Sequence, residues 1–170
     1  MNKCILKGFE PVVFSNSKIL FLGTMPSEKS LKKMEYYGNP NNSFWKLVAQ
    51  VFEIENLKTY EDKIACIENY NLALWDVLAH CERIGSLDSN IRNPIINNFE
   101  AFFDANSQIQ HIFFTSKNAY NLYRKYVGNF YMKNYTILPS PSGAYAVMKF
   151  EEKLQHWKII KDIHEKLTKK

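Results

Sequence analysis

The sequence predicts an α/β protein in which a central, mostly parallel sheet of four strands lies between helices. Two observations indicate this class. Four short runs consist mainly of apolar residues, as strands buried on both faces do, and they occupy 18–22, 72–76, 111–115 and 135–138. Segments with apolar residues at helical spacing separate these runs, and this alternation is typical of a parallel sheet covered on both faces.

The first strand leads into the most unusual stretch of the chain. The run 18–22 is stopped by Gly23, and Pro26 prevents the strand from continuing. The later segment 36–45 combines tyrosines, asparagines, a glycine and a proline directly before a Phe-Trp pair. Such a loop offers flat aromatic faces together with amides, which suits it to stacking on a planar ring and hydrogen bonding beside it.

The N-terminal segment and the first helices follow from apolar spacing and capping residues. Residues 1–17 are expected to cover one edge of the core through the apolar side chains of Phe9, Val12, Val13 and Phe14. A helix is predicted to begin at Ser43, a favourable N-cap residue, and a second helix is predicted over 60–69, opened by Glu61 and Asp62 as the helix dipole prefers.

The second half of the chain repeats the alternation. The run 72–76 closes on a carboxylate, Asp76, and the polar segment 81–94 is predicted to be a loop. The fourth strand is ended abruptly by the Pro-Ser-Pro-Ser-Gly segment at 139–143. Further helices are predicted over 97–106, 117–126 and 150–167.

Composition bounds the class of protein. A chain of 170 residues with 46% hydrophobic and 23% charged residues is expected to form a single globular domain over 1–170, and its net charge of +5 is compatible with nucleic acid. The odd number of cysteines and the lack of a C-x-x-C pair favour a reducing, cytoplasmic compartment. We expect no metal, no cofactor, no signal peptide and no membrane span.

All four predicted strands end in a distinctive loop. These loops are Gly-Thr-Met-Pro at 23–26, Trp-Asp at 75–76, Thr-Ser-Lys at 115–117 and the segment 139–143. Because the carboxyl ends of parallel strands lie along one edge of the sheet, the four loops are expected to converge on one site.

These motifs resemble the uracil-DNA glycosylase superfamily, and most closely its hypoxanthine-DNA (deoxyinosine) glycosylase branch. The resemblance covers about residues 18–157 and rests on four motifs in order, namely 23–26, 36–45, 74–76 together with 81–89, and 138–143. It implies a three-layer α/β/α fold with a four-stranded parallel sheet. It also implies hydrolysis of the N-glycosidic bond of a damaged base that has been flipped out of double-stranded DNA, which leaves an abasic site. We expect a monomer.

The resemblance makes Asn42 the candidate catalytic residue. Asn42 matches the asparagine of the family's Asn-x-Phe-Trp element, and its amide can hold a water molecule near the anomeric carbon. The alternative is that Asn42 only caps the helix that begins near Ser43. Met25 stands where other branches carry a water-activating Asp or Asn, and Leu138 where the classical uracil branch has a catalytic His.

The same resemblance implies a base-binding set formed by Thr24, Met25, Tyr37, Trp75 and Asp76. Tyr37 is expected to stack on the flipped base, and the alternative is a core tyrosine. Thr24 and Met25 offer backbone N–H groups and an apolar wall. Asp76 can accept a hydrogen bond from N1–H of hypoxanthine or N3–H of uracil; otherwise it is a helix N-cap or an ion-pair partner of Arg83 or Arg92. Trp75 is also a candidate for packing.

The loop after the fourth strand resembles the family's DNA-pressing loop. The candidate DNA-binding residues are Lys117, Ser140, Pro141, Ser142, Gly143 and Tyr145. Serine hydroxyls can donate to phosphates, Gly143 permits close backbone approach, and Tyr145 is a candidate wedge. Lys117 can contact a phosphate at the start of its helix or be simply solvated.

Three functions stay open at this level. The first is a monofunctional glycosylase that prefers hypoxanthine, and the second is the same reaction on uracil. The third is a module of the same fold that binds DNA without catalysis. Relative release of the two bases separates the first two, and the lack of any release identifies the third.

Overall fold

The computed structural model describes residues 4–129, 131 and 134–169. Its centre is a sheet of four parallel strands in the order β3-β2-β6-β7, which confirms the predicted fold class. The strands are β2 (Ile19–Gly23), β3 (Leu72–Asp76), β6 (His111–Phe114) and β7 (Asn134–Ile137). Every residue of β2, β3 and β6 is buried, as expected for strands covered on both faces.

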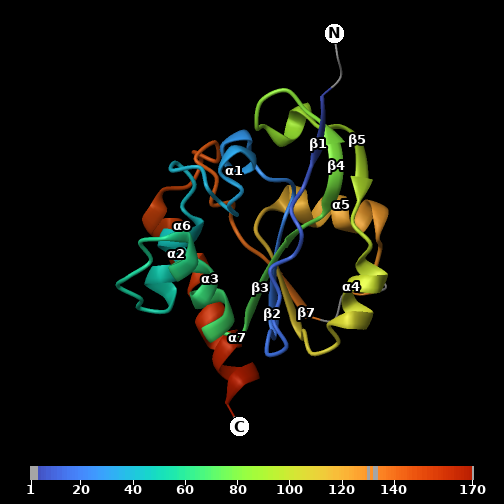
Figure 1. Cartoon of the computed structure of the whole chain (residues 1–170). Coiled ribbons are helices and arrows are strands. Elements are labelled where there is room, and N and C mark those ends of the chain that lie inside the picture. The colour runs from blue at the N-terminus through green and yellow to red at the C-terminus, as the bar shows by residue number, and fades with distance from the viewer. Residues whose placement is uncertain (1–3, 130, 132–133, 170) are drawn as a thin grey trace.

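Helices cover both faces of this sheet (Figure 1). One face is covered by α2 (Phe44–Val51), α3 (Tyr60–Asn69), α6 (Phe150–Trp157) and α7 (Ile159–Thr168), and the other by α4 (Phe99–Ala105) and α5 (Lys117–Tyr126). Alternate residues of β2 serve the two layers. Phe21 belongs to the first core and Leu22 to the second, because successive strand side chains point to opposite faces.

Most of the predicted helices are confirmed, two of them with the same bounds. The helices α3 and α5 begin and end where the sequence predicts, and Thr59 and Asp62 form a capping box at the start of α3. The predicted helix over 150–167 is divided at Lys158 into α6 and α7. There the N–H of Lys161 donates to the carbonyl of Lys158, which is the shorter spacing of a 3₁₀ turn.

The prediction of a loop over 81–94 is wrong. This region holds the last two residues of β4 (Leu78–Glu82), the short 3₁₀ helix η1 (Asp88–Asn90) and the first three residues of β5 (Arg92–Ile96). With β1 (Ile5–Lys7) these strands form an antiparallel sheet in the order β1-β4-β5. Pro94 is tolerated because β5 pairs on one side only, and an edge strand can lack one N–H donor.

The N-terminal segment covers the sheet as predicted and adds the strand β1. Phe9, Val12 and Phe14 pack on the first core and Val13 on the second. Val12 forms an antiparallel bridge with Leu74 of β3, so the segment covers part of the outer edge of the main sheet. The short helix α1 (Glu28–Lys33) follows β2.

Phe21 occupies the centre of the first core, and its truncation should be costly. Its ring is fully buried and stacks on Phe113 and Trp157 at centroid distances of 5.5 Å and 6.2 Å. We expect Phe21→Ala to lower the free energy of unfolding by about 3–5 kcal/mol, measured by urea denaturation. Ile84→Ala, at a side chain that is 84% exposed, should change it by less than about 0.5 kcal/mol. Equal effects of the two substitutions would contradict this placement of the core.

Candidate active site

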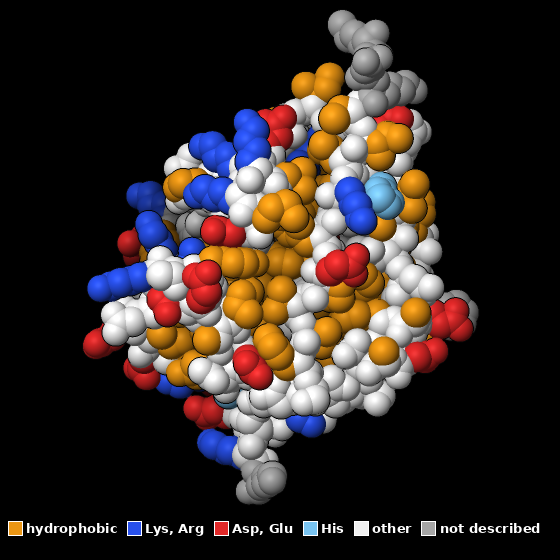
Figure 2. All heavy atoms as spheres, viewed as in Figure 1, with side chains coloured by type: hydrophobic (Ala, Val, Ile, Leu, Met, Phe, Trp, Pro, Cys, Tyr) orange, Lys and Arg blue, Asp and Glu red, His pale blue; other side chains and the backbone are white. Residues whose placement is uncertain are grey.

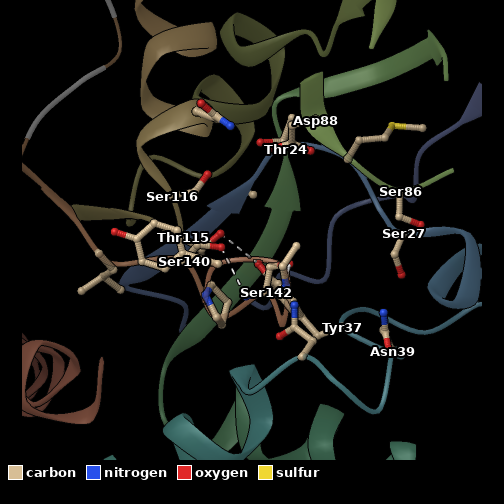
Figure 3. A pocket seen from close by; sticks show the side chains of 18 of the residues that line it. Thr24, Ser27, Tyr37, Asn39, Ser86, Asp88, Thr115, Ser116, Ser140 and Ser142 are labelled. Carbon is tan, nitrogen blue, oxygen red and sulfur yellow. Dashed lines mark hydrogen bonds between the residues drawn. The ribbon is translucent and has the colours of Figure 1, made fainter. Parts of the chain in front are cut away.

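The four loops that follow the parallel strands converge on one pocket of about 630 Å³ (Figure 3). Further parts of its wall come from the tyrosine- and asparagine-rich stretch at 36–42, the region around η1, Ser30 of α1, and Met148 with His156 of α6. Of the residues predicted for the site, ten line this pocket, and they are Thr24, Met25, Tyr37, Asn42, Asp76, Lys117, Ser140, Pro141, Ser142 and Tyr145. Trp75 and Gly143 do not.

Gly23 allows two functional side chains to approach the end of β2. It pairs with Asp76 across β2 and β3. A Cβ atom at Gly23 would lie 2.6 Å from Oδ1 of Asp76 and 3.2 Å from Oη of Tyr37. The first distance is shorter than a van der Waals contact allows, so only glycine leaves the carboxyl in this position.

Asp76 is a buried carboxyl with an unused oxygen. It is 5% exposed, and its Oδ2 atom has no hydrogen-bond partner among the described residues. Burial raises the pKa of Asp76 to about 7, the negative charge of Asp88 adds to this rise, and Arg83 opposes it. A buried acceptor without a partner is costly, so a ligand with a hydrogen-bond donor would be favoured here.

The structure supports neither alternative role for Asp76. The residue is followed by Val77 and β4, so it caps no helix. The Arg83 guanidinium donates to the carbonyls of Pro26 and Gly85, and within the described part of the chain it forms no ion pair with Asp76. Arg92 donates to the carbonyls of Ser89 and Ile91.

A second carboxyl, Asp88 on η1, lines the pocket and was missed by the sequence analysis. Burial raises its pKa, while neighbouring Thr24, Asn118 and the Arg83 charge favour its ionised form. Figure 3 shows Thr24 and Asp88 beside one another. The Oγ1 atom of Thr24 is buried and makes no hydrogen bond of good geometry within the described residues. The only signal for Asp88 in the sequence was its position in a polar segment interpreted as a loop.

Tyr37 presents an aromatic ring to the pocket. One face of the ring stacks on Phe44 with a centroid distance of 3.8 Å and an interplanar angle of 8°. The phenol lies 3.5 Å from Oγ1 of Thr115, and burial together with nearby Asp76 raises its pKa, so the group stays neutral. The backbone φ of Tyr37 is +54°, which is strained for a non-glycine residue. This backbone conformation accompanies the position of the ring, which lies against Phe44 at the pocket wall.

Asn42 lines the pocket and also contacts the start of α2. Its Oδ1 atom accepts a hydrogen bond from the N–H of Phe44 at 2.9 Å, whereas Ser43 makes no side-chain capping bond. The capping interaction predicted as an alternative is therefore present. It fixes the orientation of the amide, and a carbonyl oxygen with two lone pairs can accept a second hydrogen bond.

The loop over 139–145 is held by hydrogen bonds to its backbone. The carbonyl of Pro139 accepts from Nε1 of Trp157, and the carbonyl of Pro141 accepts from the N–H of Ser43. A Cβ atom at Gly143 would lie 2.8 Å from the carbonyl oxygen of Asn41, so Gly143 provides close packing against the Asn42 segment and does not line the pocket.

The two serine hydroxyls of this loop accept hydrogen bonds within the loop and can still donate one each to a ligand. Oγ of Ser140 accepts from the N–H of Ser142, and Oγ of Ser142 accepts from the N–H of Ala144. A hydroxyl that accepts a hydrogen bond can still donate one, so both groups can donate to a ligand at the pocket rim. Figure 3 shows both side chains at the pocket.

Trp75 belongs to the second core and not to the pocket. Its ring packs on Phe99 and Phe102 of α4, and its Nε1 donates to the carbonyl of Phe9. The side chain precedes Asp76 by one residue in β3, and strand side chains alternate between the two faces. The ring therefore points toward α4, and the structure assigns it to packing.

Positive charge lies beside the pocket. Ser27, the N-cap of α1, lines the pocket, and α1 carries the exposed lysines Lys29, Lys32 and Lys33. Figure 2 shows Lys and Arg side chains gathered over α1 on this face. Lys117, also exposed, follows Ser116, which caps α5 through the N–H of Ala119. The surroundings of the pocket therefore suit an anionic partner.

Two classes of feature are not found in the described part of the chain. Within residues 4–129, 131 and 134–169, His, Cys, Asp and Glu side chains form no group of three or more that could hold a metal ion. Over the same residues, no helix has the length and apolar character needed to cross a membrane.

Comparison with known proteins gives a consistent set of similarities. A family model described as the uracil DNA glycosylase superfamily matches residues 11–163. A hypoxanthine DNA glycosylase of Methanosarcina acetivorans is 37% identical over 142 residues, which are 82% of this chain and 88% of that protein. A hypoxanthine DNA glycosylase of Methanosarcina barkeri is 32% identical over 115 residues, 66% of this chain and 72% of that protein.

A solved structure has the same fold. The solution NMR structure of a candidate uracil DNA glycosylase from Methanosarcina acetivorans superposes with a TM-score of 0.81 at 32% sequence identity. The match covers 95% of this chain and 99% of the other. The similarity therefore extends over the sheet, the covering helices and the loops that form the pocket.

The close approach at Gly23 leads to a testable prediction. Gly23→Ala should force the Asp76 carboxyl or the Tyr37 phenol to move, because the added methyl group overlaps the first. We expect the free energy of unfolding to fall by about 1–3 kcal/mol in urea denaturation. A Gly23→Ala protein with unchanged stability and an unchanged position of Asp76 in a crystal structure would disprove the crowding.

Proposed function

The chain belongs to the uracil DNA glycosylase superfamily, and we propose that it hydrolyses the N-glycosidic bond of hypoxanthine in double-stranded DNA, leaving an abasic site. The relatives named hypoxanthine DNA glycosylases support this activity. The structural observation that carries it is one pocket with a stacking ring, Tyr37, and a buried carboxyl with an unused oxygen, Asp76. Such a pocket suits a flat base that presents an N–H group.

The base must leave the duplex to reach this pocket. Asp76 is buried at the end of β3 and cannot contact a base that is still paired and stacked. Tyr37 already stacks on Phe44, so a flipped base would become the third layer of that stack. Stacking on an aromatic side chain contributes roughly 1–3 kcal/mol per base and partly replaces the stacking lost in the duplex.

Asp76 and Thr24 together match the group that deamination creates. Adenine carries an acceptor at N1 beside an amino donor, whereas hypoxanthine carries N1–H beside the O6 carbonyl. Ionised Asp76 accepts from N1–H, and the Thr24 hydroxyl, which makes no hydrogen bond of good geometry in the protein alone, would turn from Asp88 to donate to O6. Adenine would place its N1 acceptor against the carboxylate and leave it unpaired, which disfavours the undamaged base.

Uracil is the second candidate substrate. It has the same donor and acceptor order, with N3–H beside a carbonyl, so the pair of Asp76 and Thr24 does not by itself separate the two bases. The names of the relatives support the purine.

Asn42 would position the attacking water. In this proposal the water adds to the anomeric carbon as the bond to the base breaks, and the base leaves with the bonding electrons. The proton that the added water loses passes to solvent, and the departing base takes up a proton from solvent. The amide is held by its bond to the N–H of Phe44, so its remaining hydrogen-bonding capacity is presented in one orientation. Neither Met25 nor Leu138 can move a proton, so catalysis would come mainly from positioning and from stabilising the departing base.

Duplex DNA would be held at the rim of the pocket. Ser140 and Ser142 donate to phosphates in this proposal, Tyr145 enters the space left by the flipped base, and Lys117 contributes charge. The protein would act as a monomer in the cytoplasm, and its unpaired cysteines fit a reducing compartment.

Base release is the direct test of the function. Under single-turnover conditions, duplexes with one hypoxanthine, uracil, xanthine or thymine are incubated with the protein and then cleaved with alkali at abasic sites. We expect hypoxanthine to be released fastest and Asn42→Ala to slow its release by about 100-fold, since misplacing a reacting group costs about this much. DNA that is bound but never cleaved would identify a non-catalytic module, and release of uracil alone would identify a pyrimidine pocket.

A control separates catalysis from capping at Asn42. Serine also caps helices, so Asn42→Ser should retain the bond to the start of α2 but lack an amide that reaches the water. Both variants should lose base release, whereas only Asn42→Ala should lose stability, by about 0.5–2 kcal/mol in urea denaturation. If Asn42→Ser released the base at the wild-type rate, Asn42 would act only as a helix cap.

The pKa of Asp76 predicts a pH dependence. Because the ionised carboxylate accepts from N1–H more strongly than the protonated acid does, kcat/KM should rise as the pH increases through about 7. Asp76→Asn retains an acceptor without titrating, so its profile should be flat across this range.

The raised pKa also means that ionised Asp76 destabilises the fold. Asp76→Asn should therefore raise the unfolding free energy relative to wild type, and this gain should be larger at pH 8 than at pH 4.

Asp88→Asn is the matched control for this pH profile. It removes the negative charge that adds to the rise in the pKa of Asp76, and so the step in kcat/KM should move to lower pH. A wild-type profile without a step near neutral pH would contradict the proposed role of Asp76.

A further inference from the structure

Lys153 of α6 is a buried cation without a counter-charge. Its side chain is only 5% exposed, yet no carboxylate within the described residues lies at ion-pair distance from its Nζ atom. Burial lowers the pKa of Lys153, and no neighbouring charge is a further cause of the shift. A buried ammonium without an anion is unfavourable, so its retention at this position calls for a reason.

The ammonium group of Lys153 contacts the loop at the pocket rim. Its Nζ atom donates to the carbonyl of Ser142 at 3.2 Å and lies 5.4 Å from the centre of the Tyr145 ring. An ammonium has three donors, and the hydrogen bond to Ser142 uses one of them. The cation is therefore held directly behind two residues that line the pocket.

The neighbouring contacts keep the same loop in place. Trp157, one helical turn after Lys153, donates to the carbonyl of Pro139, and the N–H of Ser43 donates to that of Pro141. With three backbone carbonyls engaged on α2 and α6, the hydroxyls of Ser140 and Ser142 stay at the pocket. Two hydroxyl donors backed by an ammonium form a combination that suits the oxygens of a phosphodiester.

We propose that Lys153 positions the loop at 139–145 and supplies the counter-charge for the phosphate contact that the proposed function gives to Ser140 and Ser142, on the DNA strand that carries the flipped nucleotide. In this site the two hydroxyls contact the phosphate, and Lys153 is a positioning residue that shapes the loop and supplies its counter-charge. The inference rests on the proposed function because it takes DNA as the ligand. It gives the buried lysine a role that an apolar side chain of equal length could not fill.

The test measures binding without catalysis. Binding to a duplex that contains a tetrahydrofuran abasic-site analogue is followed by fluorescence anisotropy between 50 and 200 mM salt. We expect Lys153→Met to weaken binding about tenfold at 150 mM salt. The magnitude of the slope of log K against log salt concentration should decrease by about one, because the variant neutralises one phosphate fewer. Lys153→Arg, which keeps the charge, should retain the wild-type slope.

A matched control removes a charge from the adjacent surface. Lys158 follows α6, is exposed, and its side chain forms no hydrogen bond or ion pair with the loop within the described residues. Lys158→Met should therefore leave the slope unchanged and affect affinity by less than about twofold. The melting temperature of Lys153→Met should equal or exceed that of wild type, because the substitution removes a buried charge. This result would show that the weaker binding does not come from unfolding.

The outcomes distinguish this inference from the proposed function. A folded Lys153→Met protein that binds with the wild-type slope would overturn the phosphate site, whatever the protein does to hypoxanthine. A wild-type protein that releases no base but whose binding responds to Lys153→Met as expected would refute the glycosylase and leave the phosphate site standing.

Discussion

The pocket depends on the close approach of β2 and β3 at their carboxyl ends, where Gly23 has no side chain. This gap lets the Asp76 carboxyl and the Tyr37 phenol lie beside the end of β2, where a methyl group would overlap the carboxyl and crowd the phenol. Parallel register brings Gly23 and Asp76 opposite one another, and Tyr37 reaches the same point from the loop after α1. The rest of the site is arranged around these three residues.

The structure retains several features that oppose stability, and they gather at this edge of the sheet. Unpaired buried atoms of Thr24 and Asp76, the strained backbone of Tyr37 and the buried charge of Lys153 are each unfavourable in the protein alone. The two apolar cores on either side of the sheet supply the stability that tolerates them. Such a concentration of locally unfavourable groups is typical of a functional site, where a ligand completes the missing interactions.

Much of the architecture followed from local pattern, and the failures had identifiable causes. The bounds of α3 and α5 followed from capping residues and apolar spacing. The region 81–94 was misread because the strands of a small, partly exposed sheet are not continuously apolar, and its glycine, serines and aspartate resemble loop residues. Asp88 was missed for the same reason. Trp75 was included with its neighbour Asp76, although alternation along a strand turns its ring toward α4.

The sequence by itself determined the fold class, the order along the chain of the four strands of the main sheet, and the set of loops at one edge of that sheet, because periodicity and glycine or proline breaks are local properties. Only the tertiary structure decided which of those residues meet. The stacking of Tyr37 on Phe44, the crowding of Asp76 against Gly23 and the burial of Lys153 behind Ser142 join segments far apart in sequence or depend on how they pack. Contacts of this kind are set by the packing of helices on the sheet, and no local pattern encodes them.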